Sequence, residues 1–328
     1  MLACLSILVA LGVSAQTPKV QLSGWMLLDD DGTSFKTYKA HANVTKSVST
    51  DWIHCNKQGV VSRGPHPTAA ERKELISVAH QHGGRVFAMA VNENFEPDGV
   101  EVALASPKAM KDHVAAIMKI VLEDGVDGLD LDYESLNAKD REPFSAFVQM
   151  LGTSLHAKHK KLVIAVHGKE SEPGTWGGTQ SQDYAAIGKA VDSIRVMTYD
   201  FHWETSEAGP IAPPDWVERV MTFAKSVVPA NKLELGIPAY GYDWLGKKAN
   251  GIAWDQFTPL VKTYGPAKRD ASQELVLNYK GRTIYFADGA ASIPKFGISK
   301  KLGLTGLAMW RLGAEDPAFW AVYDKYSK

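Results

Sequence analysis

The sequence predicts a (β/α)8 barrel with a small α+β insertion between the seventh and eighth strands. Short apolar runs alternate with amphipathic stretches along the 328 residues, a pattern typical of α/β folds. There are eight such runs, the strand number of the barrel, and barrels of this length form one domain. An open doubly wound sheet is the alternative, but no glycine-rich dinucleotide fingerprint follows the first run.

The predicted strands are the apolar runs that begin at intervals of roughly 30 to 40 residues. They are Val20–Leu27, Ser47–Ile53, Arg85–Val91, Gly125–Tyr133, Lys161–His167, Ser193–Tyr199, Leu233–Tyr240 and Leu304–Trp310.

Helix signals lie between these strands. Thr68 and Glu71 form a capping box for a helix that stops at Gly83, and Ser106 followed by a proline starts a helix ending near Asp124. Further amphipathic patterns predict helices over 141–159, 182–190 and 214–228.

The interval from Leu233 to Leu304 is 71 residues, more than one helix requires. Within it, Glu274–Tyr279 and Thr283–Phe286 read as a hairpin joined at Lys280 and Gly281. We therefore expect an α+β insertion over 245–303 within a catalytic domain of residues 16–328.

The first residues, MLACLSILVALGVSAQ, form an apolar run too short to span a bilayer, followed by small residues. This pattern predicts a signal peptide over 1–15, although its start carries no Lys or Arg. Removal of the signal would leave Cys55 as the only cysteine. We expect a secreted or periplasmic protein without a membrane anchor, and its formal charge of −1 gives no general attraction to nucleic acid.

The stretch VLEDGVDGLDLDYESL places Asp130, Asp132 and Glu134 at alternate positions of one predicted strand. Residues two apart in a strand point the same way, about 6.6 Å apart, so the acids should form a column inside the barrel. Glu134 would lie at the C-terminal mouth, where barrel active sites are built. Carboxylates this close in a partly dry site cannot all ionise, so a proton is retained near neutral pH. Glu134 is therefore a candidate general acid.

Asp127 has the opposite parity, and we expect it to bond backbone around Gly128 and to shape the strand. Two other interpretations of the stretch are a solvated acidic turn, which the interleaved Leu and Tyr disfavour, and a divalent-metal site. No further set of acidic or histidine ligands is evident at neighbouring strand ends. We therefore expect no metal.

Residues 127–134, DGLDLDYE, resemble the DGxDxDxE signature of glycoside hydrolase family 18, the chitinase family. Residues 197–200, MTYD, are similar to the M-x-Y-D of that family's sixth strand, and Trp310 is placed like its eighth-strand tryptophan. The segments 209–244 and 286–313 resemble the bacterial branch that contains spore-cortex and other peptidoglycan-associated members. The resemblance extends over nearly the whole chain after the signal and implies the same barrel.

The resemblance also implies a mechanism, because this family is an exception to the two-carboxylate scheme of glycosidases. Glu134 would protonate the glycosidic oxygen, while the substrate's own 2-acetamido oxygen attacks the anomeric carbon with retention of configuration. Asp132 would orient the acetamido N–H and share a proton with Asp130 or Glu134. Tyr199 would donate a hydrogen bond to the acetamido group. No organic cofactor is required.

The resemblance places Asp200, Met197 and Trp310 against the substrate, with Trp310 beneath the sugar whose bond is cut. Other aromatic residues at strand ends are ambiguous, because each either lines a sugar subsite or packs in the core: Trp25, Trp203 and Tyr240. Trp176, in the loop PGTWGG after the fifth strand, is a lid, a platform or a surface anchor.

We therefore expect a secreted glycosidase that hydrolyses β-1,4-linked N-acetylglucosamine in chitin, chito-oligosaccharides or peptidoglycan. Two alternatives stay open. One is a non-hydrolytic chitin-binding lectin on the same fold, although such relatives typically lose the acid that stands here as Glu134. The other is a metal-dependent phosphodiesterase.

Overall fold

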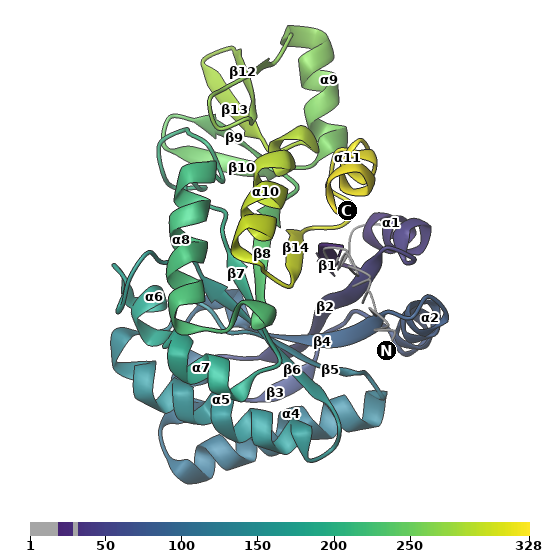
Figure 1. The fold of residues 1–328 in the computed structure, drawn as a ribbon. Helices are drawn as coiled ribbons and strands as arrows, with labels where there is room; N and C mark the ends of the chain where they lie inside the picture. Colours follow the sequence, from purple (N-terminus) through teal and green to yellow (C-terminus); the bar gives the residue numbers. More distant parts are fainter. Residues whose placement is uncertain (1–18, 29–31) are drawn as a thin grey trace, which may run out of the picture.

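The protein, seen in a computed structural model that describes residues 19–28 and 32–328, is built on a closed barrel of eight parallel strands (Figure 1). β1 pairs with β14 on one side and with β2 on the other, which closes the sheet. The strand order is β1, β2, β4, β5, β6, β7, β8, β14. Their bounds are Gln21–Met26, Thr45–Cys55, Arg85–Asn92, Gly128–Asp132, Lys161–His167, Ser193–Met197, Leu233–Pro238 and Gly306–Trp310.

All eight predicted strands are therefore present, and the (β/α)8 barrel is confirmed rather than the open sheet. A short extra strand, β3 (Val61–Arg63), pairs antiparallel with β2. The predicted signal peptide, 1–15, lies outside the described residues.

Helices surround the barrel, and one more, α9 (Trp254–Tyr264), lies against a second sheet (Figure 1). Their bounds are α1 Thr33–His41, α2 Ala69–Gln81, α3 Asp98–Leu104, α4 Pro107–Asp124, α5 Arg141–His156, α6 Gly177–Ser181, α7 Tyr184–Ala190, α8 Pro214–Val227, α9 Trp254–Tyr264, α10 Ile293–Leu302 and α11 Phe319–Tyr326.

Two helix starts follow the predicted chemistry. At α2, Thr68 Oγ accepts from the Glu71 N–H while the Glu71 carboxylate accepts from the Thr68 N–H, so the capping box is complete. At α4, Ser106 Oγ accepts from Ala109 N–H, and the helix ends at Gly125, whose φ is 72°. The helix predicted to start at 182 starts instead at Tyr184, because Asp183 caps it.

A second, five-stranded sheet follows the carboxyl end of β8 and projects from the barrel with α9 (Figure 1). Its strands are β9 Gly241–Leu245, β10 Lys248–Ile252, β11 Lys268–Arg269, β12 Leu275–Tyr279 and β13 Arg282–Phe286. Lys280 and Gly281 join β12 to β13 with φ values of 44° and 76°, the positive values that a tight hairpin turn needs.

The sheet has its own core, which includes Phe257 and Phe286. Its strands run from 241 to 286, whereas the sequence placed the insertion at 245–303. The difference at the far end has a physical reason: Phe296 and Leu302 of α10 pack in the main hydrophobic core. α10 is therefore a helix of the barrel.

No helix in the described ranges is both long and apolar enough to cross a membrane.

Candidate active site

The three acids of β5 and its C-terminal end form the expected column. Asp130 and Asp132 are 0% and 4% exposed, and the Glu134 side chain, just beyond the strand, is 22% exposed. The alternate residues Leu129 and Leu131 point the other way, into the core beneath the helices. One oxygen of each aspartate, Oδ1, is buried without a hydrogen-bond partner. The column is thus dry at its base and open only at Glu134.

Asp130 is fixed from across the barrel. Its Oδ2 accepts from Trp25 Nε1 of β1 at 2.9 Å and from Arg195 Nη1 of β7 at 2.5 Å. Arg195 is fully buried, lies 3.2 Å from Glu234 of β8, and donates to two serine hydroxyls of β2. One guanidinium therefore forms ion pairs with two buried carboxylates.

Arg195 was missing from the predicted site, although the sequence holds a signal. It is the only charged residue in the strand SIRVM, and it has the same parity as Met197 and Tyr199. A lone cation that alternates inward in a barrel strand must be paired, because an unpaired buried charge is strongly destabilising.

Asp132 lies between the other two acids and forms no ion pair within residues 19–28 and 32–328. Burial raises its pKa well above the usual range, and the charges of Glu134, Asp130 and Asp51 raise it further, while Arg195 opposes them. The proton that the sequence required is therefore held readily at Asp132.

The pKa of Glu134 is raised to about 7, mainly by burial and then by the charge of Asp200. The Asn92 side chain fixes its backbone: Oδ1 accepts from the Glu134 N–H at 2.9 Å, and Nδ2 donates to its carbonyl at 3.0 Å. A carboxyl with this pKa is protonated often enough near pH 7 to act as a general acid.

His167, at the end of β6, is a second residue that the sequence reasoning missed. Its Nε2 lies 3.6 Å from Glu134 Oε2 and accepts the Ser135 N–H at 3.3 Å, so the proton of the neutral ring is on Nδ1. Burial lowers its pKa to about 4. A neutral imidazole beside Glu134 adds no charge that would pull the proton off the acid. The only signal was its place after the apolar run LVIAV.

Tyr199 and Asp200 follow β7 and lie beside the column. Tyr199 is 8% exposed, and burial together with the charge of Asp132 raises its hydroxyl pKa. Asp200 has a φ of 58° and accepts at Oδ1 from the hydroxyls of Tyr240 and Tyr242, the latter at 3.1 Å. Burial raises the pKa of Asp200 although both hydroxyls oppose the rise.

The aromatic residues divide by exposure. Trp310 is partly buried and meets Trp25 edge to face at 6.0 Å, with Met197 packed against the same cluster. Trp25 is 1% exposed, so the structure places it beneath the site, bonded to Asp130. Tyr240 is 8% exposed and holds Asp200, and Trp203 is 51% exposed. Direct sugar contact by these residues stays a prediction.

Asp127 and Gly128 lie at the other end of β5. Asp127 Oδ2 accepts from the Val86 N–H of β4 at 2.8 Å and lies 3.0 Å from His80 Nε2. A Cβ at Gly128 would lie 2.1 Å from the Lys161 carbonyl oxygen, closer than any side chain can approach. Asp127 therefore bonds the start of β5 to β4, and Gly128 allows β6 to approach it closely, both at the end of the strand away from the acids.

Among the described residues, no three or more His, Cys, Asp or Glu side chains are placed to hold a metal ion. The absence of a metal from the reaction stays a prediction.

The arrangement combines one partly exposed acid with a pKa near neutral, a buried carboxyl that retains a proton, and the Tyr199 hydroxyl, whose pKa the charges of both acids raise. This combination can protonate a leaving oxygen while a second carboxyl orients a polar group of the substrate.

Comparison with known proteins agrees with this chemistry. The model of the family described as "Glycosyl hydrolases family 18" matches residues 75–315. The chain is 26% identical over 313 residues to the uncharacterized glycosylase YvbX of Bacillus subtilis (strain 168), covering 91% of this chain and 89% of that protein. It is 27% identical over 268 residues to the cortical fragment-lytic enzyme of Bacillus anthracis, covering 76% and 62%.

Among solved structures, the chitinase from Chromobacterium violaceum ATCC 12472 superposes with a TM-score of 0.84 at 26% identity, over 93% of this chain and 98% of that one. The expected resemblance, including that to spore-cortex relatives, is confirmed. The matched segment contains the acid column and covers well over half of the chain, and the chain therefore belongs to glycosyl hydrolases family 18.

Proposed function

We propose that this glycoside hydrolase cleaves β-1,4-linked N-acetylglucosamine glycans with retention of configuration, using the substrate's own acetamido group as nucleophile. The observation that carries the proposal is the protonation pattern of the column. Glu134 has a pKa of about 7 at the open end, and Asp132 beneath it also retains a proton.

In the proposed reaction, Glu134 donates its proton to the glycosidic oxygen as the bond to the anomeric carbon breaks. The acetamido carbonyl oxygen attacks that carbon and forms an oxazolinium ion. The buried Oδ1 of Asp132, which has no hydrogen-bond partner among the described residues, is suited to accept the acetamido N–H. Water then attacks the anomeric carbon, the bond from that carbon to the acetamido oxygen breaks to restore the acetamido group, and Glu134 regains a proton from the water.

The other residues have supporting roles. Tyr199 donates a hydrogen bond to the acetamido group, because its raised pKa keeps the hydroxyl protonated. Asp200 is held on the same side by Tyr240 and Tyr242. Arg195 forms an ion pair with Asp130 at the base of the column, and Trp310 forms the apolar floor.

The substrate class follows from the mechanism, since the nucleophile requires an N-acetylated sugar at the cut bond. The relatives support it: one is named a chitinase and another a cortical fragment-lytic enzyme. We also propose that the chain is exported by its first 15 residues, which N-terminal sequencing of the protein from culture fluid or periplasm tests.

Product analysis by mass spectrometry on chitohexaose and purified peptidoglycan tests the function. We expect fragments from at least one of them, and none from glucosamine oligomers that lack the acetyl group. Glu134→Gln should abolish cleavage while sparing binding. Binding by the wild type without any cleavage would instead support a lectin.

A further inference from the structure

Trp176 is an exposed indole beside the candidate acid. It is 45% exposed, and its ring centroid lies 4.7 Å from that of His167, at 58°. His167 Nε2 in turn lies 3.6 Å from Glu134 Oε2. Nearly half of this large apolar residue is thus open to solvent, one side chain away from the candidate acid. A ligand that covered it would be stabilised by burial of that apolar surface.

The position of Trp176 is fixed by its own loop and by α6. Thr179 Oγ accepts from the N–H groups of Thr175 and Trp176 at 3.1 and 3.2 Å, and donates to the Trp176 carbonyl at 2.8 Å. The ring packs directly on Gly178, where a Cβ would lie 2.2 Å from the indole Cη2 atom. The absence of a side chain at Gly178 therefore sets where the indole lies.

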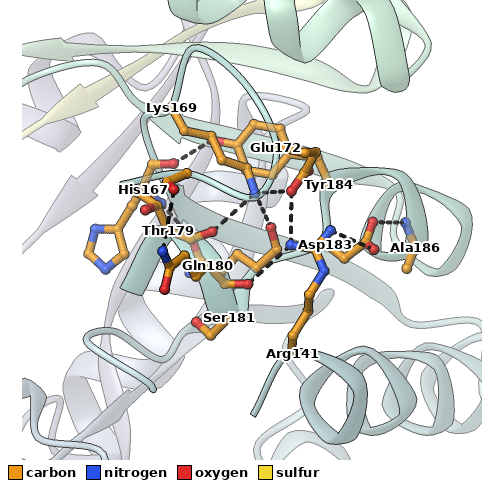
Figure 2. Close-up of polar contacts among 12 residues, drawn as sticks. Arg141, His167, Lys169, Glu172, Thr179, Gln180, Ser181, Asp183, Tyr184 and Ala186 are labelled. Carbon is orange, nitrogen blue, oxygen red and sulfur yellow. Dashed lines mark hydrogen bonds and ion pairs between the residues drawn. The ribbon is translucent and has the colours of Figure 1, made fainter. Parts of the chain in front are cut away.

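Lys169 is buried inside the loop that carries Trp176 and forms hydrogen bonds to several of its residues (Figure 2). The Lys169 ammonium donates to the Glu172 carboxylate at 2.9 Å and to the carbonyls of Thr179 and Gln182 at 3.0 and 2.5 Å. It also lies 4.5 Å from the centre of the Tyr184 ring. Three acceptors match its three N–H donors, the condition under which a buried ammonium is tolerated. Lys169 is 4% exposed.

The barrel order places the loop of Trp176 next to Glu134 and across the barrel from Trp310. Trp310 ends β14, Glu134 follows β5, and the loop of Trp176 follows β6, which is next to β5 and three strands from β14. If the sugar being attacked rests on Trp310, the sugar that leaves lies on the Glu134 side, because the acid must reach the oxygen between them.

We propose that Trp176 is the stacking surface for the N-acetylglucosamine residue on the leaving-group side, and that Lys169 and Gly178 are positioning residues for it. This inference rests on the proposed glycosidase function and adds a specificity determinant. A flat apolar ring held rigidly suits the apolar face of a pyranose, since little conformational entropy is lost on binding.

The test compares two substrates in the full-length protein. N,N′-diacetylchitobiosyl fluoride has no sugar on the leaving-group side, whereas chitotetraose does. The readout is the ratio of kcat/KM on chitotetraose to kcat/KM on the fluoride. For Trp176→Ala we expect this ratio to fall about tenfold, the size of one aromatic contact, and Trp176→Tyr should keep most of it.

Gly178→Ala and Lys169→Met should lower the ratio in the same direction, although Trp176 itself is intact. Lys232→Met is the matched control for lysine, because Lys232 Nζ also donates to two carbonyls, of Gly188 and Val191, both at 2.8 Å, but precedes β8 at the other end of the barrel. Its ratio should equal that of the wild type.

Each outcome decides something. An unchanged ratio in Trp176→Ala overturns the proposal, and so does a wild type that hydrolyses the fluoride but not chitotetraose. If the ratio of the two kcat/KM values falls equally in Lys169→Met and Lys232→Met, Lys169 has only a structural role and the positioning role is overturned. A wild type inactive on both substrates contradicts the glycosidase function itself.

Discussion

Glu134→Gln should stabilise the folded protein at alkaline pH. The folded state raises the pKa of Glu134 from its usual 4.5 to about 7, so it binds a proton more tightly than the unfolded chain does. Ionised Glu134 therefore destabilises the fold by almost nothing below pH 4.5, by an amount that grows between pH 4.5 and about 7, and by a constant amount above that. Glutamine has the shape of the protonated acid and carries no such penalty.

The magnitude follows from the shift. At 1.36 kcal/mol per pKa unit, Glu134→Gln should raise the free energy of unfolding by about 3 kcal/mol at pH 8, by about 1 kcal/mol at pH 5, and by almost nothing at pH 4. These are upper values, since the side chain is 22% exposed and solvent screens part of the effect.

Urea unfolding of the wild type and of Glu134→Gln at pH 5 and pH 8 measures both differences. Glu142→Gln, a change on the exposed surface of α5, is the control and should show no pH-dependent gain. A Glu134→Gln protein that is equally or less stable at pH 8, or whose gain is the same at both pH values, would refute the reasoning that burial and repulsion raise this pKa.

Three further predictions follow from the same geometry. The kcat/KM for release of a fluorophore from a chitobioside should fall above about pH 7, as Glu134 loses its proton; a profile that stays flat to pH 9 contradicts this. Arg195→Met should lower the free energy of unfolding, measured in urea, by about 3 to 5 kcal/mol, because it leaves two buried carboxylates unpaired. A decrease of less than about 1 kcal/mol would contradict this. Gly128→Ala should cost at least about 3 kcal/mol through its clash with Lys161, whereas Gly297→Ala, where the new Cβ meets nothing within 4 Å in α10, should gain about 0.5 to 1 kcal/mol.

The fold could be predicted from the sequence because barrel strands are buried on both faces. Each strand therefore reads as an apolar run, such as KLVIAVH or GLAMW, at an interval set by the helix that follows. The insertion was harder to delimit. Its strands are short, and β10 and β11 are largely exposed, so these two carry little hydrophobic pattern. The apolar residues of α10 belong to the barrel.

The sequence by itself determined the column of Asp130, Asp132 and Glu134, because alternation along one strand is a local property of the backbone. It also determined that one proton must remain in that column. Closure of the barrel decided which distant residues complete the site. Trp25 and Arg195 reach Asp130 from strands 105 and 65 residues away in the chain, and His167 reaches Glu134 from the adjacent strand. Such partners are set by register and closure, which depend on all eight strands together.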